Sequence, residues 1–343
     1  MPAHSVFLDA CRRRPTAFTP IWLMRQAGRY MAEYRAMRER WGFLELCKNS
    51  QAAAEVTLQP VERLGVDAAI LFADILLVLE PLGVGLEFTR SGGPHIQRPV
   101  RSAADVARLP AVKVDDAVGF VFETVGGVRK ALADRVPLIG FAGAPFTLAS
   151  YLIEGEASRE FLLTKRFMRA EPEAWHALLA RLADITAAYL NGQIAAGAQA
   201  VQLFDSWVGT LSPADYREFV LPHSRALFAR LTPEVPVIHF GVGTSTLLSS
   251  MKEAGGDVIG LDWRVELGPT WERLGHDVAV QGNLDPAVLL SGPRDIRRAA
   301  QAILEGAARR PGHIFNLGHG VHQETPVEHV KALVDIVHEL SSR

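Results

Sequence analysis

The sequence predicts a single-domain (β/α)8 barrel of the TIM type over residues 1–343. Three observations favour this fold class. Eight short apolar or β-branched runs alternate with helix-like stretches, which is the pattern of repeated βα units around a parallel sheet. The chain length suits one such barrel, and polar or glycine-rich segments follow the runs. Alternation alone does not establish closure, so an open doubly wound sheet is the second interpretation.

The expected strands are the eight apolar runs, in chain order 20–25, 68–73, 137–142, 200–204, 236–240, 257–261, 278–282 and 313–317. Residues 173–196 carry alanine, leucine and isoleucine at helical spacing. Ser212 followed by Pro213 has the pattern of an N-cap with proline at the first helical position. Residues from 326 to 340 are expected to form a closing amphipathic helix.

One segment departs from the βα rhythm. Residues 82–100 show short alternation of apolar and polar side chains on both sides of Ser91, Gly92 and Gly93. Glycine between two alternating runs is the pattern of a hairpin turn. We therefore expect a hairpin excursion here rather than another unit of the barrel.

Composition restricts the classes of partner. The formal net charge is -2, so no overall basic field attracts nucleic acid or an anionic membrane. No apolar stretch reaches 18 residues, and the first ten residues lack the basic head and apolar core of a signal peptide. The sequence thus predicts a cytoplasmic protein that binds neither nucleic acid nor a membrane.

The sequence also disfavours metal and lysine chemistry. Cys11 and Cys47 have no metal-ligand spacing, and there is no His-Glu-x-x-His helix or Walker loop. None of the six lysines stands at an expected strand end, which disfavours a Schiff-base or pyridoxal-phosphate enzyme. The glycine loop 241–246 is not a dinucleotide fingerprint, although its amides suit an anion.

Arg25 and Arg29 lie on either side of Gly28, directly after the first expected strand. A guanidinium is always charged and grips a carboxylate with two parallel N–H donors, so this pair suits a polyanionic ligand. Glycine lets the backbone approach such a ligand closely. The alternative is that both arginines are ordinary solvated surface charges.

In a parallel barrel the loops after the strands meet at one end of the molecule. If the strand assignment holds, the polar residues that follow the strands share one cavity. Besides the arginine segment, these are Asp74, 143–145, Asp205 and Ser206, 241–245, Asp262, 283–285 and 318–320.

Four residues at or near the expected strand ends have two interpretations each. Asp74 ends an apolar stretch, so its carboxylate needs a polar or cationic partner; it serves either as a helix cap or salt bridge, or as an acceptor that stabilises positive charge. Tyr151 and Ser206 either donate hydrogen bonds to a ligand or satisfy local backbone. His319, between two glycines, is either structural or exposed to a ligand.

The sequence closely resembles the uroporphyrinogen decarboxylase family. The resemblance begins with Met-Arg-Gln-Ala-Gly-Arg-Tyr at 24–30 and covers essentially the whole chain in the expected order. Its other motifs lie at 72–76, 140–148 with Tyr151, 202–206, 281–286 and 316–320. The family implies a (β/α)8 barrel, a homodimer, and removal of carbon dioxide from the four acetate side chains of uroporphyrinogen III. No cofactor and no metal is implied.

The resemblance also implies roles for individual residues. It assigns substrate binding to Arg25, Gln26, Ala27, Gly28, Arg29, Arg38, Asp74, Tyr151, Ser206 and His319. Asp74, Arg29 and Arg25 are the candidates for catalysis. The arginines suit the carboxylates at the substrate's periphery, and Asp74 suits its four central pyrrole N–H groups and the ring cation formed during decarboxylation. Two roles stay open for Arg25 and Arg29. Either one of them is the general acid, or both only anchor carboxylates of the substrate.

Two other functions remain as alternatives. Corrinoid-linked methyl transfer on the same barrel uses zinc held by cysteine and histidine, but no cysteine accompanies His239 or His319 in the sequence. A non-catalytic tetrapyrrole-binding protein would keep the arginines for transport, but it needs fewer groups at the macrocycle's centre than Asp74, Tyr151 and His319 supply.

Overall fold

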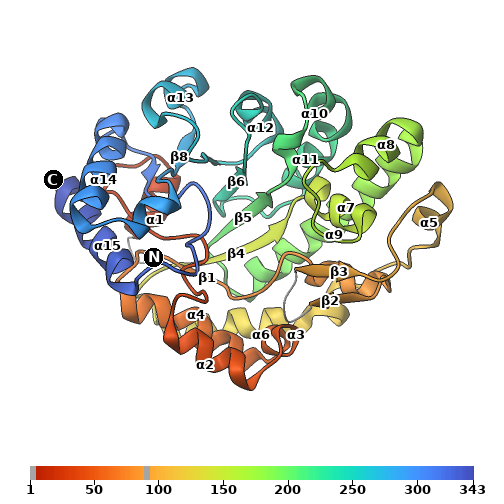
Figure 1. The fold of residues 1–343 in the computed structure, drawn as a ribbon, viewed down its shortest axis with the longest axis horizontal. Coiled ribbons are helices and arrows are strands. Elements are labelled where there is room, and N and C mark those ends of the chain that lie inside the picture. The colour runs from red at the N-terminus through yellow and green to blue at the C-terminus, as the bar shows by residue number, and fades with distance from the viewer. Residues whose placement is uncertain (1–4, 89–92) are drawn as a thin grey trace.

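The computed structural model describes residues 5–88 and 93–343. Within these residues seven strands form one parallel sheet in the order β1-β4-β5-β6-β7-β8-β9. Both faces of the strands are covered, which is why their sequences are continuous apolar runs. The strands form an inner layer that the helices surround (Figure 1). Their bounds are β1 Ala69–Ile70, β4 Leu138–Gly143, β5 Ala200–Asp205, β6 Val237–Gly241, β7 Val258–Gly260, β8 Ala279–Gln281 and β9 His313–Ile314.

A single bridge closes the sheet. Ile21 pairs in parallel with Phe315, just after β9, and its carbonyl accepts the Asp67 N–H at 2.8 Å, just before β1. The predicted βα barrel is therefore confirmed, with one bridge residue in place of an eighth strand. The strand expected at 20–25 is wrong beyond this bridge, because the chain turns at Gln26, whose N–H donates to the carbonyl three residues earlier at 2.9 Å.

The helices cover the outside of the sheet (Figure 1). Within the described ranges, none of them combines the length and the apolar character that a membrane crossing requires. The α-helices are α1 Val6–Cys11, α2 Ala32–Arg40, α3 Phe43–Lys48, α4 Ser50–Leu64, α5 Ala103–Arg108, α6 Val114–Leu132, α7 Pro145–Glu154, α8 Leu162–Ala170, α9 Pro172–Ala196, α10 Pro213–Phe219, α11 Leu221–Phe228, α12 Leu248–Ala254, α13 Leu267–Leu274, α14 Pro293–Ala307 and α15 Val327–Ser341. The short 3-10 helices are η1 Leu77–Leu82, η2 Val208–Thr210 and η3 Pro286–Leu290.

The local helix signals in the sequence are confirmed. Helix α9 matches the expected helix 173–196, and α15 matches the closing helix within one residue at either end. The Ser212 hydroxyl accepts the Asp215 N–H at 3.1 Å, which satisfies one of the free donors at the start of α10.

Helix α1 closes the end of the barrel where the strands begin. The guanidinium groups that follow it donate to carbonyls before β6 and β8: Arg12 to Glu234 at 3.1 Å and Arg13 to His276 at 3.2 Å. Phe7 is fully buried in the same core cluster as Trp22. This packing leaves the opposite end, where the strands finish, for a site.

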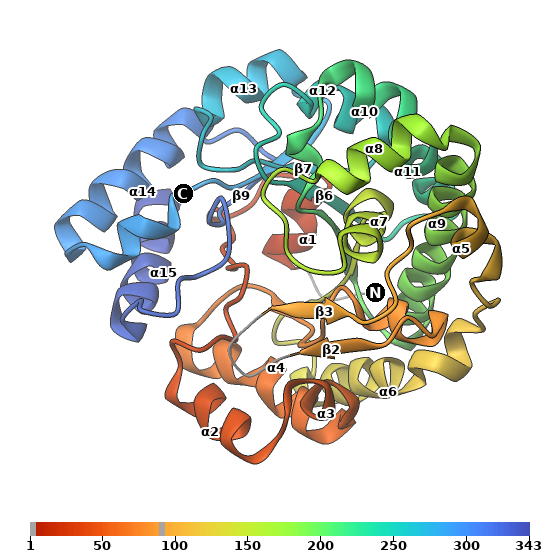
Figure 2. The ribbon, with the colours of Figure 1, turned by 45° about the vertical axis from the view of Figure 1, so that its right-hand side comes forward.

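The predicted hairpin excursion is also confirmed. Strands β2 (Leu86–Phe88) and β3 (Pro94–Ile96) pair antiparallel in register and stand apart from the barrel sheet (Figure 2). The Ile96 N–H donates to the carbonyl of Gly155 at 2.7 Å, which fastens the hairpin to the end of α7. Of the expected turn, Ser91 and Gly92 lie outside the described residues.

Candidate active site

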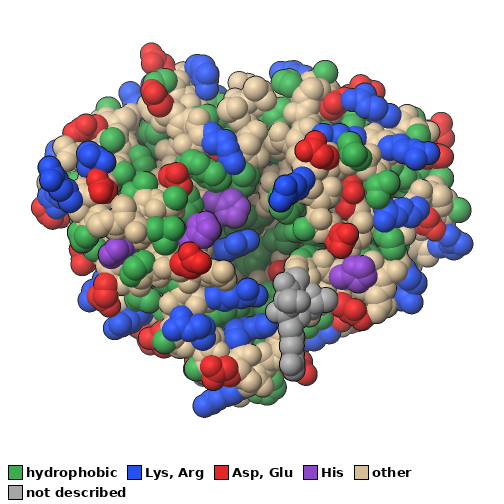
Figure 3. All heavy atoms as spheres, in the orientation of Figure 1, with side chains coloured by type: hydrophobic (Ala, Val, Ile, Leu, Met, Phe, Trp, Pro, Cys, Tyr) green, Lys and Arg blue, Asp and Glu red, His purple; other side chains and the backbone are tan. Residues whose placement is uncertain are grey.

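The ends of the parallel strands bring the predicted polar residues to one rim. Asp74 follows β1, Tyr151 lies in the helix after β4, Ser206 follows β5 and His319 follows β9. The arginine segment follows the Ile21 bridge that closes the sheet. A space-filling view shows a hollow with apolar side chains in its depth and Lys, Arg and His side chains around its rim (Figure 3).

The loop that carries Arg25 is held from below by two buried amides. The Asn316 Oδ1 accepts the Met24 N–H at 3.1 Å. The Gln26 Oε1 accepts the Leu23 N–H at 3.1 Å, and its Nε2 donates to the Ala68 carbonyl at 3.1 Å. Gln26 is fully buried and both ends of its amide are used within the protein, so its side chain braces the loop and does not enter the cavity.

The same loop brings its own backbone close together. Arg25 has a φ of 61°, an uncommon left-handed conformation for a residue other than glycine. A Cβ on Gly28 would lie 2.9 Å from the Arg25 carbonyl oxygen, so the glycine is required for close approach within the loop. Ala27 and Gly28 are half-buried, and Arg29 is exposed.

Three arginines of this segment form no ion pair with the residues that the structure describes: Arg25, Arg29 and Arg38. Arg38, in α2, is half-buried, and its guanidinium carbon lies 5.1 Å from the centre of the Phe43 ring. Its Nη1 is buried without a hydrogen-bond partner in the described structure. A buried guanidinium donor without an acceptor is costly, and a carboxylate is the kind of group that a guanidinium binds most strongly.

Asp74 lies half-buried at the end of β1, and its Oδ1 accepts the Leu76 N–H at 2.8 Å. Burial raises the pKa of Asp74 to about 6, while the Leu76 N–H and the charge of Arg25 oppose that rise. The carboxylate thus lies near an arginine without forming a hydrogen-bonded pair with it, and no hydrogen bond to its second oxygen is found among the residues that the structure describes.

Tyr151 and Ser206 contribute neutral donors. The Tyr151 ring packs edge-on against Trp207 with 5.9 Å between centroids. Burial, followed by the nearby Asp74 carboxylate, raises the pKa of Tyr151 to about 12, so the phenol keeps its proton at neutral pH. Ser206 is half-buried immediately after β5.

The His319 ring is oriented by the backbone of Gly320. Its Nδ1 accepts the Gly320 N–H at 2.7 Å, so the ring proton of the neutral form is on Nε2. Burial, followed by the charges of Arg25 and Arg264, lowers the pKa of His319 to about 4, which keeps the ring neutral. A side chain on Gly320 would overlap that of Arg25, so the Arg25 side chain packs against the residue that follows His319.

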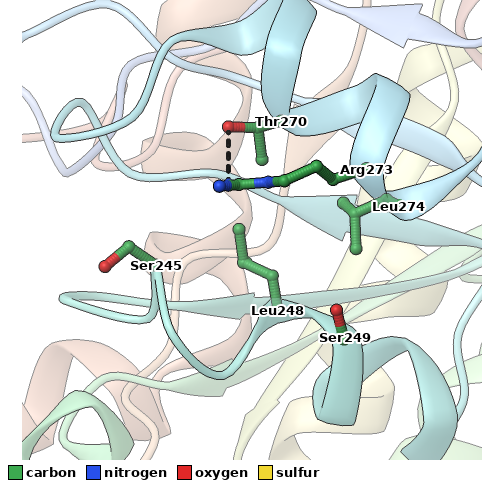
Figure 4. Close-up of a pocket in the computed structure, with 6 residues that line it drawn as sticks. All are labelled: Ser245, Leu248, Ser249, Thr270, Arg273 and Leu274. Atoms are coloured by element: carbon green, nitrogen blue, oxygen red, sulfur yellow. Dashed lines mark hydrogen bonds between the residues drawn. The ribbon is translucent and has the colours of Figure 1, made fainter.

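Two cavities lie apart from this rim. One, of about 220 Å³, opens between α12 and α13 and is lined in part by Thr270 and Arg273 (Figure 4). The other, of about 460 Å³, lies between α2 and α4. Neither is lined by a residue that the family resemblance assigns to substrate binding, although Ser245, from the strand-end segment 241–245, lines the first. In the glycine loop, the Gly243 N–H already donates to the Asp262 carboxylate, which limits that loop as an anion site.

The family is decided by comparison with known proteins. The family model "Uroporphyrinogen decarboxylase (URO-D)" matches residues 3–340. The chain belongs to this family. The uroporphyrinogen decarboxylase of Carboxydothermus hydrogenoformans is 57% identical over 99% of this chain and 97% of its own length. That of Sorangium cellulosum is 56% identical over 98% of this chain and 97% of its own length.

The barrel also occurs in a solved structure that has a different name. The solved structure of a methyltransferase from Methanosarcina mazei matches with a TM-score of 0.82 and 20% identity over 97% of both chains. At that identity the likeness shows the shared fold alone. Cys11 lies in α1 at the far end of the barrel, and the described residues contain no group of three or more His, Cys, Asp or Glu suited to a metal ion. No observation favours the methyl-transfer alternative.

Proposed function

We propose that this chain removes the four acetate carboxyl groups of uroporphyrinogen III as carbon dioxide, giving coproporphyrinogen III in tetrapyrrole biosynthesis. The observation that carries the proposal is Asp74: a half-buried carboxylate at the end of β1, beside an arginine that has no ion-pair partner in the described structure. The identity of more than half to uroporphyrinogen decarboxylases over nearly the full length supports it.

The chemistry requires an anion beneath the centre of the macrocycle. Protonation of a pyrrole carbon next to an acetate arm creates a ring cation. The bond to the carboxylate then breaks, carbon dioxide leaves, and its electron pair neutralises the cation. A second proton adds to the exocyclic carbon to give a methyl group, and the first proton leaves the ring carbon, which restores the pyrrole. Asp74 accepts the pyrrole N–H groups and stabilises the cation in the transition state. The substrate ring serves as its own electron sink.

The remaining side chains supply hydrogen-bond donors, and the carboxylates of the substrate are acceptors. The cations Arg25, Arg29 and Arg38 bind carboxylates, as guanidinium forks do elsewhere. The neutral donors are the Tyr151 and Ser206 hydroxyls and the His319 Nε2–H, and each extends the same complementarity. Within the loop, the amide of Gln26 and the small residues Ala27 and Gly28 hold the arginines in position.

The source of the first proton has two candidates. A guanidinium is a very weak acid, so Arg25 or Arg29 acts as the donor only through a relayed water or a strongly altered environment. Anchoring of substrate carboxylates needs neither. Anchoring is therefore the assignment that we adopt for both arginines, with acid catalysis as the competing hypothesis that a Lys variant tests.

Four further assignments belong to this proposal. The chain works as one barrel domain over residues 1–343, as a homodimer in the cytoplasm, and without cofactor or metal. These follow the family, whose model matches nearly the whole chain.

The direct test is anaerobic incubation with reduced uroporphyrinogen III, followed by oxidation and chromatography of the porphyrins. Stepwise appearance of products with seven, six, five and four carboxylates is the expected result. Unchanged octacarboxylate, in a preparation where a known decarboxylase is active, would overturn the proposal.

A further inference from the structure

An additional arginine stands on the rim away from the segment 22–38. The closed barrel has eight positions, which are the seven strands and the Ile21 bridge. Arg264 follows β7, which lies four positions from β1 in the order β1-β4-β5-β6-β7. Asp74 follows β1, so Arg264 rises on the side of the barrel opposite Asp74. Its position was not singled out by any motif, because the sequence alone does not indicate which polar residue after a strand faces the cavity.

The Arg264 guanidinium is oriented before any ligand arrives. Its Nη1 lies 3.0 Å from Asp262 Oδ2, and its backbone N–H donates to the other carboxylate oxygen at 2.9 Å. The guanidinium carbon stands 3.9 Å from the centre of the Trp263 ring, a cation–π contact. Asp262 is only 2% exposed and is also bound by the Gly243 N–H, so it is a fixed support.

The outward edge of Arg264 remains open. Its side chain is 50% exposed although its acidic partner is buried. Within the described structure the guanidinium donates to one acceptor, Asp262. A guanidinium has five N–H donors in a planar fork, so the edge turned away from Asp262 can donate hydrogen bonds to a second carboxylate.

The loop after β7 is joined to the predicted site through His319. The Trp263 ring meets the His319 ring edge-on, with 6.1 Å between centroids. A side chain on Gly318 would overlap the backbone of Trp263, so the loops after β7 and β9 are in direct contact. The charge of Arg264, like that of Arg25, acts on His319. Arg25, His319 and Arg264 thus lie along one continuous stretch of the rim.

We propose that Arg264 binds a peripheral carboxylate of the tetrapyrrole, on the side opposite Asp74, with Asp262 and Trp263 positioning its guanidinium. The inference rests on the proposed substrate. A macrocycle with carboxylates on all four rings directs some of them away from the segment 22–38, and those need cations on another part of the rim. Arg264 lies at that part of the rim, because its guanidinium stacks on Trp263 and the Trp263 ring in turn contacts His319.

The test compares Arg264→Met, which keeps the length but removes charge and fork, with Arg264→Lys, which keeps the charge. Arg273→Met is the matched control, because Arg273 points into the separate cavity between α12 and α13 (Figure 4). Two quantities are measured: the KM and kcat for uroporphyrinogen III, and the dissociation constant of oxidised uroporphyrin from quenching of tryptophan fluorescence.

Loss of one carboxylate contact is expected to raise KM and the dissociation constant about 10-fold in Arg264→Met, with kcat within about twofold, since the contact serves ground state and transition state alike. Arg264→Lys should give a smaller increase, and Arg273→Met none. The dissociation constant should also depend less steeply on salt in Arg264→Met than in the wild type, because one exposed ion pair has been removed.

The other outcomes overturn either the role of Arg264 or the proposed function. Unchanged KM and binding in a folded Arg264→Met protein overturn the role of Arg264 alone. Weakened binding with an unaltered salt dependence and no rescue by lysine assigns Arg264 a merely structural part in the loop and also overturns it. Absence of decarboxylation and of uroporphyrin binding in the wild type overturns the proposed function itself, together with this inference.

Discussion

Two aspartates at the ends of barrel strands have similar electrostatics and different surroundings. Burial raises the pKa of Asp74, after β1, to about 6 and that of Asp205, which ends β5, to about 7. Asp74 is half-buried, and Arg25 acts on it. Asp205 is fully buried; its Oδ1 accepts the Thr147 hydroxyl at 2.9 Å, and its Oδ2 has no partner in the described structure. A raised pKa therefore does not by itself mark a catalytic carboxylate, because burial produces it in both places.

The largest expected difference between the two aspartates is in turnover. Asp74→Asn removes the charge that stabilises the ring cation and should lower kcat about 10²-fold or more. Asp205→Asn should leave kcat within a few-fold, because no charge on Asp205 is used in the reaction. Steady-state assays on both variants, with circular dichroism as a check on folding, measure this. A comparable loss of kcat in both variants would contradict the assignment of the catalytic charge to Asp74 alone.

A substitution of Arg29 should affect substrate binding more than turnover. Arg29→Lys keeps the charge but loses the bidentate fork, so KM should rise about 10-fold while kcat falls by less. Arg40→Lys, an exposed position at the end of α2, is the control and should change neither. Normal binding with nearly complete loss of turnover in Arg29→Lys would contradict anchoring and favour acid catalysis.

The pH profile separates Asp74 from other groups. The folded pKa is raised to about 6, and the carboxylate is the active form, so kcat/KM should rise with pH through this value in the wild type. The remaining activity of Asp74→Asn should lack that rise. A profile with the same rise in both proteins would assign the titration to another group.

The smallest expected effect concerns stability. Asp205 keeps its proton to a higher pH in the folded state than in the unfolded chain, where the ordinary value of 3.8 applies. The unfolded chain then binds fewer protons between these two values, so the contribution of Asp205 to stability is lost as pH rises from about 4 through about 7.

Asp205→Asn has no proton to release. Relative to the wild type, the free energy of unfolding of the variant should therefore increase between pH 5 and pH 8, by on the order of 1 kcal/mol or more. Urea unfolding at several pH values measures it. A constant difference across this range would mean that Asp205 does not titrate there.

Much of the fold was predictable because it depends on local pattern. Seven of the eight expected strands lie within two or three residues of their predicted ends, since buried parallel strands are continuous apolar runs. The segment 20–25 has the same composition, yet only Ile21 joins the sheet. The turn that follows is stabilised by Gln26, whose side chain donates to the Ala68 carbonyl 42 positions away. No local sequence pattern predicts that contact.

The sequence by itself determined the barrel, the family and the set of polar residues that follow its strands, because these are properties of residue order and periodicity. Only the tertiary structure decided which of those residues face the cavity. Gln26 turned inward as a brace, Asp205 was sealed in the core, and Arg264 was stacked on Trp263 beside His319. The physical reason is that burial, charge and hydrogen bonding at each position depend on neighbours from distant strands, which meet only when the barrel closes.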